Sequence, residues 1–526
     1  MHSSLTAASH LLAVPRWVEV TAIAVTLVSY AALLSYVIPR HEPWADEAQA
    51  WELAKSLSLK ALFGTYIHYE GSPGLWHVLL WFLTRMHVTY GGMGWVAGAI
   101  ALSAMVLLTT AAPFPLPIRL IMPFTYFFVF QYAVVARSYV LFPVILFSLA
   151  CCWPARQERP LPVVLLVGLL GNVSAHGFAV AVGLVLVLMF EWRRLPIVGR
   201  SRWKFWSAHA ALLVIMLGFA AWCIMPARDA GWVVVAHRVV TASQPSGTSG
   251  TAWRSLQFLL DTARSAIYGL SIAFGPLYTH FRLGPVVWGL LIWVWARDGH
   301  LRYALSIPFL VALCGISSQF YHAGLVWVLF VFLWWITWPE RKEGYSVGDP
   351  REPKWIRRAL LVSVCLCLAY HLVWGYDVIR YEIAMPYSPD RDGAPILRSY
   401  LERGDRVVVA VSSRLQGDAI SQYFVTGMEP YFASQPFNNM RFKFWFWGGD
   451  DDVRQSYLRD TEMKSAVVVV EETEWDQRYL IEERRLDTLG YRRQQVVCGQ
   501  IFYPTIMSPP LCHAFYEPPN PSNSTR

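Results

Sequence analysis

The sequence predicts a polytopic α-helical membrane protein with a small soluble α/β domain at its carboxyl end. Hydrophobic residues make up 55% of the 526 residues and charged residues only 15%, and the mean hydropathy is +0.36. Apolar runs of about 15–22 residues recur along most of the chain, and such runs match the thickness of a bilayer. From Tyr376 onward the composition becomes that of a soluble domain.

The net charge of +8 does not indicate a nucleic-acid partner. The densest clusters of Lys and Arg lie in short loops between apolar runs, where basic residues report which side of the membrane a loop occupies. Three basic loops are therefore expected to be cytoplasmic: 154–160, 191–204 and 339–358.

The first apolar run, Trp17–Ile38, is expected to be an uncleaved transmembrane helix rather than a signal peptide, because no cleavage-site pattern follows it. A polar loop, Arg40–Ser72, comes next. Within it Ala45–Phe63 carries its apolar residues on one stripe, which predicts a helix lying in the membrane interface. The apolar stretch Leu75–Leu83 is too short to cross about 30 Å of hydrocarbon, so a second helix that is surface-lying or half-buried is expected.

The uncharged stretch 161–190 has two possible topologies. A single span would place one of the flanking basic loops outside, whereas a hairpin of two helices turning at 172–177 keeps both inside, and we prefer the hairpin. By the same test 253–270 is expected to be interfacial. The predicted spans then number eleven, with the amino end cytoplasmic: 17–38, 93–111, 118–135, 139–153, the two arms of 161–190, 205–226, 283–296, 301–317, 323–338 and 359–375.

Residues 376–517 are expected to form an extracytoplasmic α/β domain, and the Pro/Ser/Asn-rich tail 518–526 to be disordered. Buried strands are predicted at Arg406–Val411 and Ser465–Glu471, and helices at Ile396–Glu402, Asp418–Val425 and Glu474–Leu489. Of the eight cysteines only Cys498 and Cys512 fall in this domain, and the sequence leaves open whether they pair.

This topology gathers ionisable groups at the outer face. The first loop contributes Asp46, Glu47, His68 and Glu70, and the remaining members of the set are Arg137, Tyr139, His176 and His322. Carboxylates, imidazoles and a guanidinium at one surface suit proton abstraction beside an anionic leaving group. Structural roles are the alternative, because acidic residues also favour the first turn of a helix and an arginine can snorkel to the interface.

The same residues resemble a known family. An Asp46-Glu47 pair in the first loop, the turn Glu70–Trp76 (EGSPGLW), the Arg137-x-Tyr139 turn and the polar break at His176 resemble the GT-C class of polytopic glycosyltransferases. This class includes the lipid A aminoarabinose transferases and the protein O-mannosyltransferases. The resemblance covers about residues 17–330. The Asp that often follows the arginine in that class is absent here.

The resemblance implies a hexosyl- or pentosyltransferase of the cell membrane that takes its sugar from a polyprenyl-phosphate donor. The acceptor would be a hydroxyl on a lipid, a glycan or a protein, and Asp46 or Glu47 would remove its proton, with Asp46 favoured. The departing lipid phosphate would be met by Arg137, His176 or His322, or by a divalent cation (Mg²⁺ or Mn²⁺) held by Glu47 and Glu70. Members with and without a metal exist in the class.

Two functions of other classes remain alternatives. One is a transporter or flippase of a lipid-linked sugar, and the other is a non-catalytic membrane assembly protein that presents the soluble domain. Ionisable residues in the middle of the predicted spans are few, whereas proton-coupled carriers usually need them. The sequence therefore favours the transferase.

Overall fold

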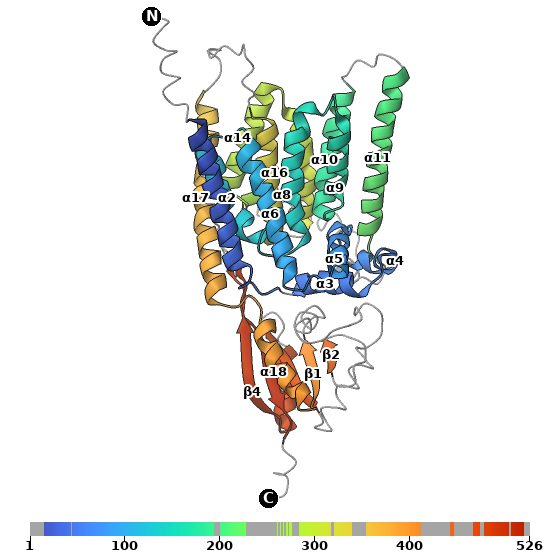
Figure 1. The fold of residues 1–526 in the computed structure, drawn as a ribbon, viewed down its shortest axis with the longest axis vertical. Coiled ribbons are helices and arrows are strands. Elements are labelled where there is room, and N and C mark those ends of the chain that lie inside the picture. Colours follow the sequence, from blue (N-terminus) through green and yellow to red (C-terminus); the bar gives the residue numbers. More distant parts are fainter. Residues whose placement is uncertain are drawn as a thin grey trace, which may run out of the picture.

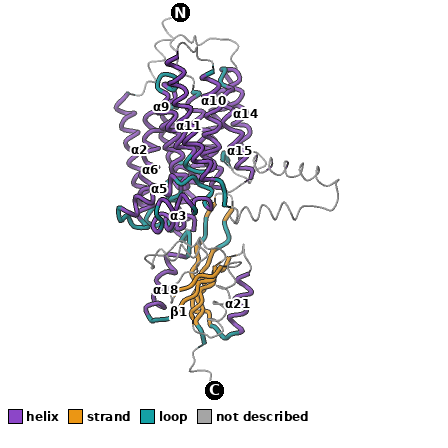
Figure 2. The backbone as a smooth tube through the Cα atoms, turned by 90° about the vertical axis from the view of Figure 1, so that its right-hand side faces the viewer, coloured by secondary structure: helices purple, strands orange, loops and turns teal. Residues whose placement is uncertain are grey.

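The protein is mostly helical, with a small sheet towards its carboxyl end (Figures 1 and 2). The computed structural model describes scattered positions between 260 and 275 and ten continuous segments: 15–43, 45–193, 200–227, 283–316, 320–338, 354–411, 442–446, 466–473, 478–503 and 506–519. The interfacial helix predicted at 253–270 lies mostly outside the described residues. The helix predicted at 418–425 and most of the tail and of the 339–358 loop also lie outside them.

Six helices in the described segments are long and apolar enough to cross a membrane. They are α2 (Arg16–Val37), α6 (Gly92–Ala111), the Ser138–Ala155 run containing α8 (Leu141–Cys152), α10 (Ala175–Trp192), α11 (Arg200–Ile224) and α17 (Lys354–Ala384). Shorter apolar helices pack among them: α9 (Pro160–Gly171), α14 (Leu283–Asp298), α15 (Ile307–Ile316) and α16 (Phe320–Ile336). The chain is thus built as a polytopic membrane protein, and the span count of eleven stays a prediction.

The stretch 161–190 folds as the helical hairpin that the charge pattern favours. Helix α9 ends at Gly171, and α10 begins after Ser174, whose hydroxyl accepts a hydrogen bond from the Gly177 amide at 3.1 Å. Gly177 is needed there, because a Cβ would lie 2.3 Å from the carbonyl oxygen of Leu170. The hairpin brings Arg156, before α9, and Glu191, at the end of α10, to the same end of the bundle.

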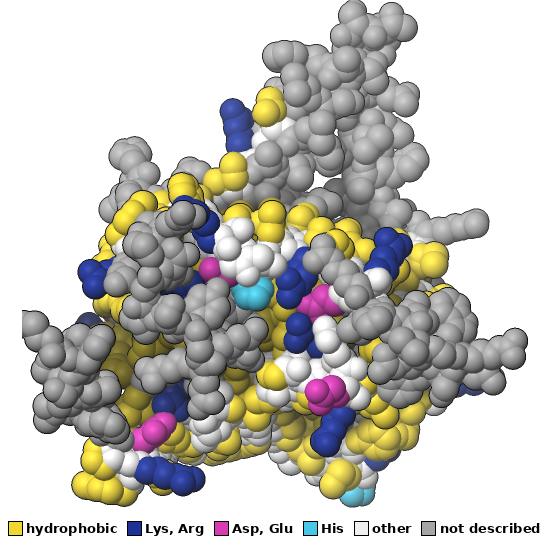
Figure 3. Space-filling view, turned by 90° about the horizontal axis from the view of Figure 1, so that it is seen from above, with side chains coloured by type: hydrophobic (Ala, Val, Ile, Leu, Met, Phe, Trp, Pro, Cys, Tyr) yellow, Lys and Arg dark blue, Asp and Glu magenta, His cyan; other side chains and the backbone are white. Residues whose placement is uncertain are grey.

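That end lies away from the carboxyl-terminal domain and shows Lys and Arg side chains among hydrophobic ones (Figure 3). There Glu191, at the end of α10, pairs with Arg156 at 2.6 Å and with Arg302 at 2.7 Å. Arg302 belongs to a short 3-10 helix, η6 (Leu301–Ser306), that precedes α15. One carboxylate thus joins three segments that are distant in sequence.

The continuous span predicted at 118–135 is wrong. The segment consists of the one-and-a-half-turn helix α7 (Leu116–Ile121), a 3-10 turn at Met122–Phe124 and a π-helical turn at Phe127–Gln131. Pro123 cannot donate a backbone hydrogen bond, and the chain changes its helical pitch around it. The residues from Tyr126 to Ala136 are almost wholly buried inside the bundle, so their apolarity reflects burial in protein rather than contact with lipid.

The first loop lies along the end of the bundle nearest the carboxyl-terminal domain (Figure 1). The single helix predicted over Ala45–Phe63 is instead two, α3 (Ala45–Ser56) and α4 (Leu59–Gly64). They divide at Ser58, whose side chain caps α4 by accepting from the Ala61 amide at 3.2 Å. Helix α5 (Leu75–Arg85) follows and has only eleven residues, as its short apolar stretch predicts.

The carboxyl-terminal domain is built on a mixed five-stranded sheet in the order β2-β1-β3-β7-β4. The predicted strands are present as β1 (Arg406–Val411) and β3 (Ala466–Thr473), and the predicted helices at 396 and 474 as α18 (Asp390–Glu402) and α21 (Arg478–Thr488). The sequence patterns do not predict the strands β2 (Phe442–Phe446), β4 (Arg492–Gly499) and β7 (Leu511–Glu517). A short hairpin, β5 (Phe502–Tyr503) and β6 (Ile506–Met507), forms a separate two-stranded sheet. Cys498 and Cys512 face each other across β4 and β7 and form a disulfide.

Buried polar contacts hold the start of the first loop to α17 and to the carboxyl-terminal domain. His41, just after α2, lies 2.7 Å from Glu382 of α17 through Nδ1. The neighbouring Glu42 accepts the backbone N–H of Arg391 in α18. Burial and then nearby Asp390 raise the pKa of Glu42 to about 9. Burial by itself would lower the pKa of His41, but Glu382 and Glu47 raise it to about 10.

Candidate functional site

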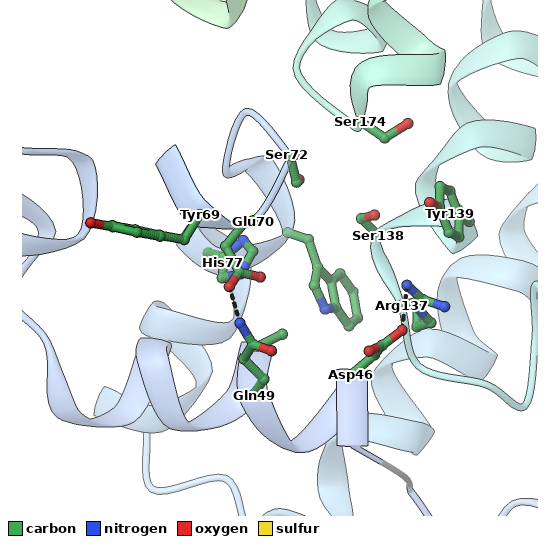
Figure 4. Close-up of a pocket in the computed structure, with 13 residues that line it drawn as sticks. Asp46, Gln49, Tyr69, Glu70, Ser72, His77, Arg137, Ser138, Tyr139 and Ser174 are labelled. Carbon is green, nitrogen blue, oxygen red and sulfur yellow. Dashed lines mark hydrogen bonds and ion pairs between the residues drawn. The ribbon is translucent and has the colours of Figure 1, made fainter. Parts of the chain in front are cut away.

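A cavity of about 250 Å³ lies where the first loop meets the end of the helical bundle (Figure 4). Two walls face each other across it. One wall holds Asp46, from the first turn of α3, and the turn 137–139. The other wall holds Gln49 of α3, the turn 69–72 and the start of α5. Ser174, at the bend of the α9–α10 hairpin, closes a third side.

On the first wall Asp46 forms an ion pair with Arg137, at 2.7 Å between Oδ2 and Nη2. The two side chains are only 23% and 18% exposed, so the pair is partly shielded from water. Burial raises the pKa of Asp46, and Arg137 opposes that shift. The Arg137 side chain keeps its charge, because Asp46 raises its pKa although burial alone would lower it. This wall therefore offers both a carboxylate of increased basicity and a fixed cation.

Aromatic and imidazole rings continue this wall into the bundle. The Arg137 guanidinium carbon lies 4.5 Å from the ring centre of Tyr321 and 5.3 Å from that of Tyr139. The hydroxyl of Tyr139 lies 2.9 Å from Nε2 of His322. The rings of His322 and His176 have their centres 4.0 Å apart. Predicted residues from three separate segments are thus brought into one continuous cluster beside Asp46.

On the opposite wall Glu70 lies between two polar residues. Its Oε1 accepts a hydrogen bond from the amide of Gln49, and its Oε2 lies 3.3 Å from Nε2 of His77. The turn that brings Glu70 and His77 together contains Gly74 at a φ of 94°. A Cβ on Gly74 would also lie 2.8 Å from the Phe63 ring. The Gly-Pro turn noted in the sequence therefore has a geometric function, which is to aim two ionisable side chains into one cavity.

Glu47 does not line the cavity. Its side chain is fully buried, and Oε1 accepts the backbone N–H of Ala136 at 2.6 Å. Its Oε2 lies 3.3 Å from Nε2 of His41. Both oxygens are thus engaged behind the cavity wall, and Glu47 and Glu70 do not form one ligand set for a cation. The described segments hold no cluster of three or more His, Cys, Asp or Glu side chains suited to a metal.

His68 also lies away from the cavity. It belongs to η1 (Tyr66–Tyr69), where its Nδ1 lies 2.8 Å from the carbonyl oxygen of Met225, beyond the end of α11. Its ring also meets Trp222 edge-on, with ring centres 5.1 Å apart. Its contacts fasten the first loop to α11.

The cavity also holds groups that sequence reasoning missed: Gln49, Trp76, His77, Ser138 and Ser174. A signal existed for two of them. Gln49 lies three residues after Asp46, a spacing that places both side chains on one side of α3. His77 lies three residues after Gly74, in the first turn of α5. A lone histidine near a helix end usually has a structural role, so only its position after the Gly-Pro turn could have distinguished it.

Comparison of the chain with protein-family models, with curated proteins and with solved structures found no match.

Proposed function

We propose that this protein is a membrane glycosyltransferase that moves a sugar from a polyprenyl-phosphate donor to an acceptor hydroxyl. The observation that carries the proposal is the cavity in which Asp46 and Arg137 form one wall at the end of the bundle. A carboxylate and a cation side by side match the two demands of glycosyl transfer, which are removal of a proton and stabilisation of an anionic leaving group.

In the proposed reaction the acceptor oxygen attacks the anomeric carbon of the donor. The bond from that carbon to the phosphate oxygen breaks, and its electron pair leaves with the lipid phosphate. Asp46 takes the proton of the acceptor hydroxyl. Arg137 stabilises the phosphate, and its shift from Asp46 to the phosphate frees the carboxylate to act as a base. Burial, which raises the pKa of Asp46, favours this role.

Two features support an extracytoplasmic location of the cavity. The cavity lies at the end of the bundle that carries the domain with the Cys498–Cys512 disulfide, and disulfides persist in oxidising compartments. Arg156 and Arg302 lie at the other end, as the positive-inside rule expects of a cytoplasmic face. The donor phosphate would then sit near the outer surface, and the carboxyl-terminal domain would stand over the entrance used by the acceptor.

The test is turnover of radiolabelled polyprenyl-phosphate sugars by the full chain in proteoliposomes. We expect release or transfer of the sugar by the wild type and its loss, by at least about a hundredfold, in D46N, because general-base catalysis contributes about 10²–10⁴. The matched control is D487N, which changes an exposed aspartate on α21 and should retain activity. Movement of the intact lipid across the membrane without cleavage would instead support a carrier, and an unaltered rate in D46N would overturn the assigned role.

A further inference from the structure

The wall opposite Arg137 has a chemistry of its own. Trp76 and His77, the second and third residues of α5, both line the cavity and are only 1% and 3% exposed. Among the described residues, the indole N–H of Trp76 and Nδ1 of His77 have no hydrogen-bond partner. Nε2 of His77 lies 3.3 Å from Glu70 without the geometry of a hydrogen bond. Buried polar atoms are normally satisfied, so such atoms beside one cavity point to a ligand that supplies their partners.

The neighbouring groups define the chemistry of that ligand. Gln49 holds one oxygen of Glu70, and the other lies beside His77. The wall thus offers an indole donor, an imidazole and a carboxylate acceptor, and the guanidinium of Arg137 lies on the opposite wall. The residues described on this wall combine hydrogen-bond donors and acceptors and include no Lys or Arg. Such a set suits the hydroxyl groups of a neutral sugar better than it suits a phosphate.

The size of the cavity limits its occupant. Its volume of about 250 Å³ lies below the range of about 300–1,000 Å³ typical of pockets for drug-sized ligands. It therefore has room for one ring rather than for two. With an anionic group against Arg137, the ring attached to that group would reach the opposite wall.

We propose that Trp76, His77 and Glu70 form a subsite for the neutral sugar ring of the donor, with the donor phosphate against Arg137. This inference rests on the proposed function and adds the residues that recognise the sugar. Trp76 donates its indole N–H to a ring hydroxyl, and Glu70 and His77 engage a second hydroxyl.

The test separates the sugar from the lipid phosphate. Thermal stability of the full chain in nanodiscs is measured with bare polyprenyl phosphate and with a panel of polyprenyl-phosphate hexoses and pentoses. We expect at least one glycosylated lipid to stabilise the wild type more than the bare lipid does. W76F and H77Q should lose this difference, each with about three- to tenfold weaker binding of the glycosylated lipid. R137Q should weaken both lipids.

The matched control is W81F on the same helix. The indole N–H of Trp81 donates to the carbonyl of Leu57 at 3.0 Å, so W81F should lower the stability of the free protein and leave the response to the lipids unchanged. W76F replaces a buried indole by a smaller ring, so it should also lower the stability of the free protein, but unlike W81F it should lose the extra stabilisation by the glycosylated lipid. The two variants thus distinguish loss of a ligand contact from loss of a structural bond.

Full sugar-dependent stabilisation in W76F and H77Q would overturn the subsite. A second measurement, saturation-transfer NMR with methyl hexosides, reads sugar binding without the lipid. If the variants bind the donors normally but lose the methyl hexoside signals, the ring belongs to the acceptor and the donor assignment is overturned. If neither lipid stabilises the wild type while methyl hexosides still bind through Trp76, the proposed function fails and a sugar subsite stands.

Discussion

Glu47 is predicted to be a positioning residue whose loss destabilises the protein although it never meets the cavity. Its carboxylate accepts the Ala136 amide at 2.6 Å, one residue before Arg137, and lies 3.3 Å from His41. His41 in turn lies 2.7 Å from Glu382. The Glu47 side chain therefore connects α3 to the turn that carries Arg137 and, through His41, to α17.

The magnitude follows from what each substitution leaves behind. E47A leaves the buried Ala136 N–H without its acceptor, which costs about 1–3 kcal/mol. It also removes one of two carboxylates from a buried imidazolium, and breaking a buried pair costs about 3–5 kcal/mol in total. Glu382 still pairs with His41 in E47A, so the second cost is not paid in full. We therefore expect a total loss of about 3–5 kcal/mol in the free energy of unfolding. E47Q keeps an oxygen for the Ala136 N–H, so its loss should be smaller by about 1–3 kcal/mol.

The assay is reversible denaturant unfolding of the purified protein in mixed micelles, which gives the free energy of unfolding for each variant. E158A is the control, because Glu158 is exposed at the other end of the bundle and its removal should change stability by no more than about 0.5 kcal/mol. A loss below about 1 kcal/mol in E47A would refute the reasoning, since it lies at the bottom of the range for one unsatisfied buried donor. Equal losses in E47Q and E47A would refute the part assigned to the Ala136 N–H.

Three further predictions concern the turn, the domain junction and the disulfide. G74A should destabilise the protein by about 1–3 kcal/mol, because Gly74 has a φ of 94°, which a residue with a Cβ rarely adopts. It should also weaken donor binding, because this turn positions the side chains of the second cavity wall. Thermal unfolding measures the first effect and a lipid-binding assay the second. The pKa values of Glu42 and His41 are raised on folding, to about 9 and about 10, so their stabilisation is present below the ordinary pKa values and is lost as pH rises towards the raised ones. The melting temperature of the wild type should therefore fall as the pH rises towards 10, and that of E42Q should fall less steeply. An equal dependence on pH in the two proteins would contradict this. Reduction of Cys498–Cys512, which closes a short loop, should lower the stability of the carboxyl-terminal domain by about 2–4 kcal/mol, whereas the C498S/C512S variant should show no response to reductant.

The apolar runs and the charge pattern were enough to predict a polytopic helical protein, the α9–α10 hairpin and the short length of α5. These features depend on the length of each apolar run and on which loops contain Lys and Arg, and both can be read directly from the sequence. The same counting was wrong at 118–135. An apolar segment buried in protein and one facing lipid have the same composition, and only packing distinguishes them.

Sequence alone also selected Asp46, Glu70, Arg137 and Tyr139, because acidic, basic and aromatic groups stand out at predicted outer turns. The sequence did not show which of the predicted residues face one cavity. Glu47 follows Asp46 directly, yet the helix turns its side chain by about 100° into a buried network, whereas His77, which only its position after the turn at Gly74 distinguishes in the sequence, enters the cavity. Such assignments depend on contacts between residues distant along the chain, as between Glu47 and Ala136, so they are decided by tertiary packing.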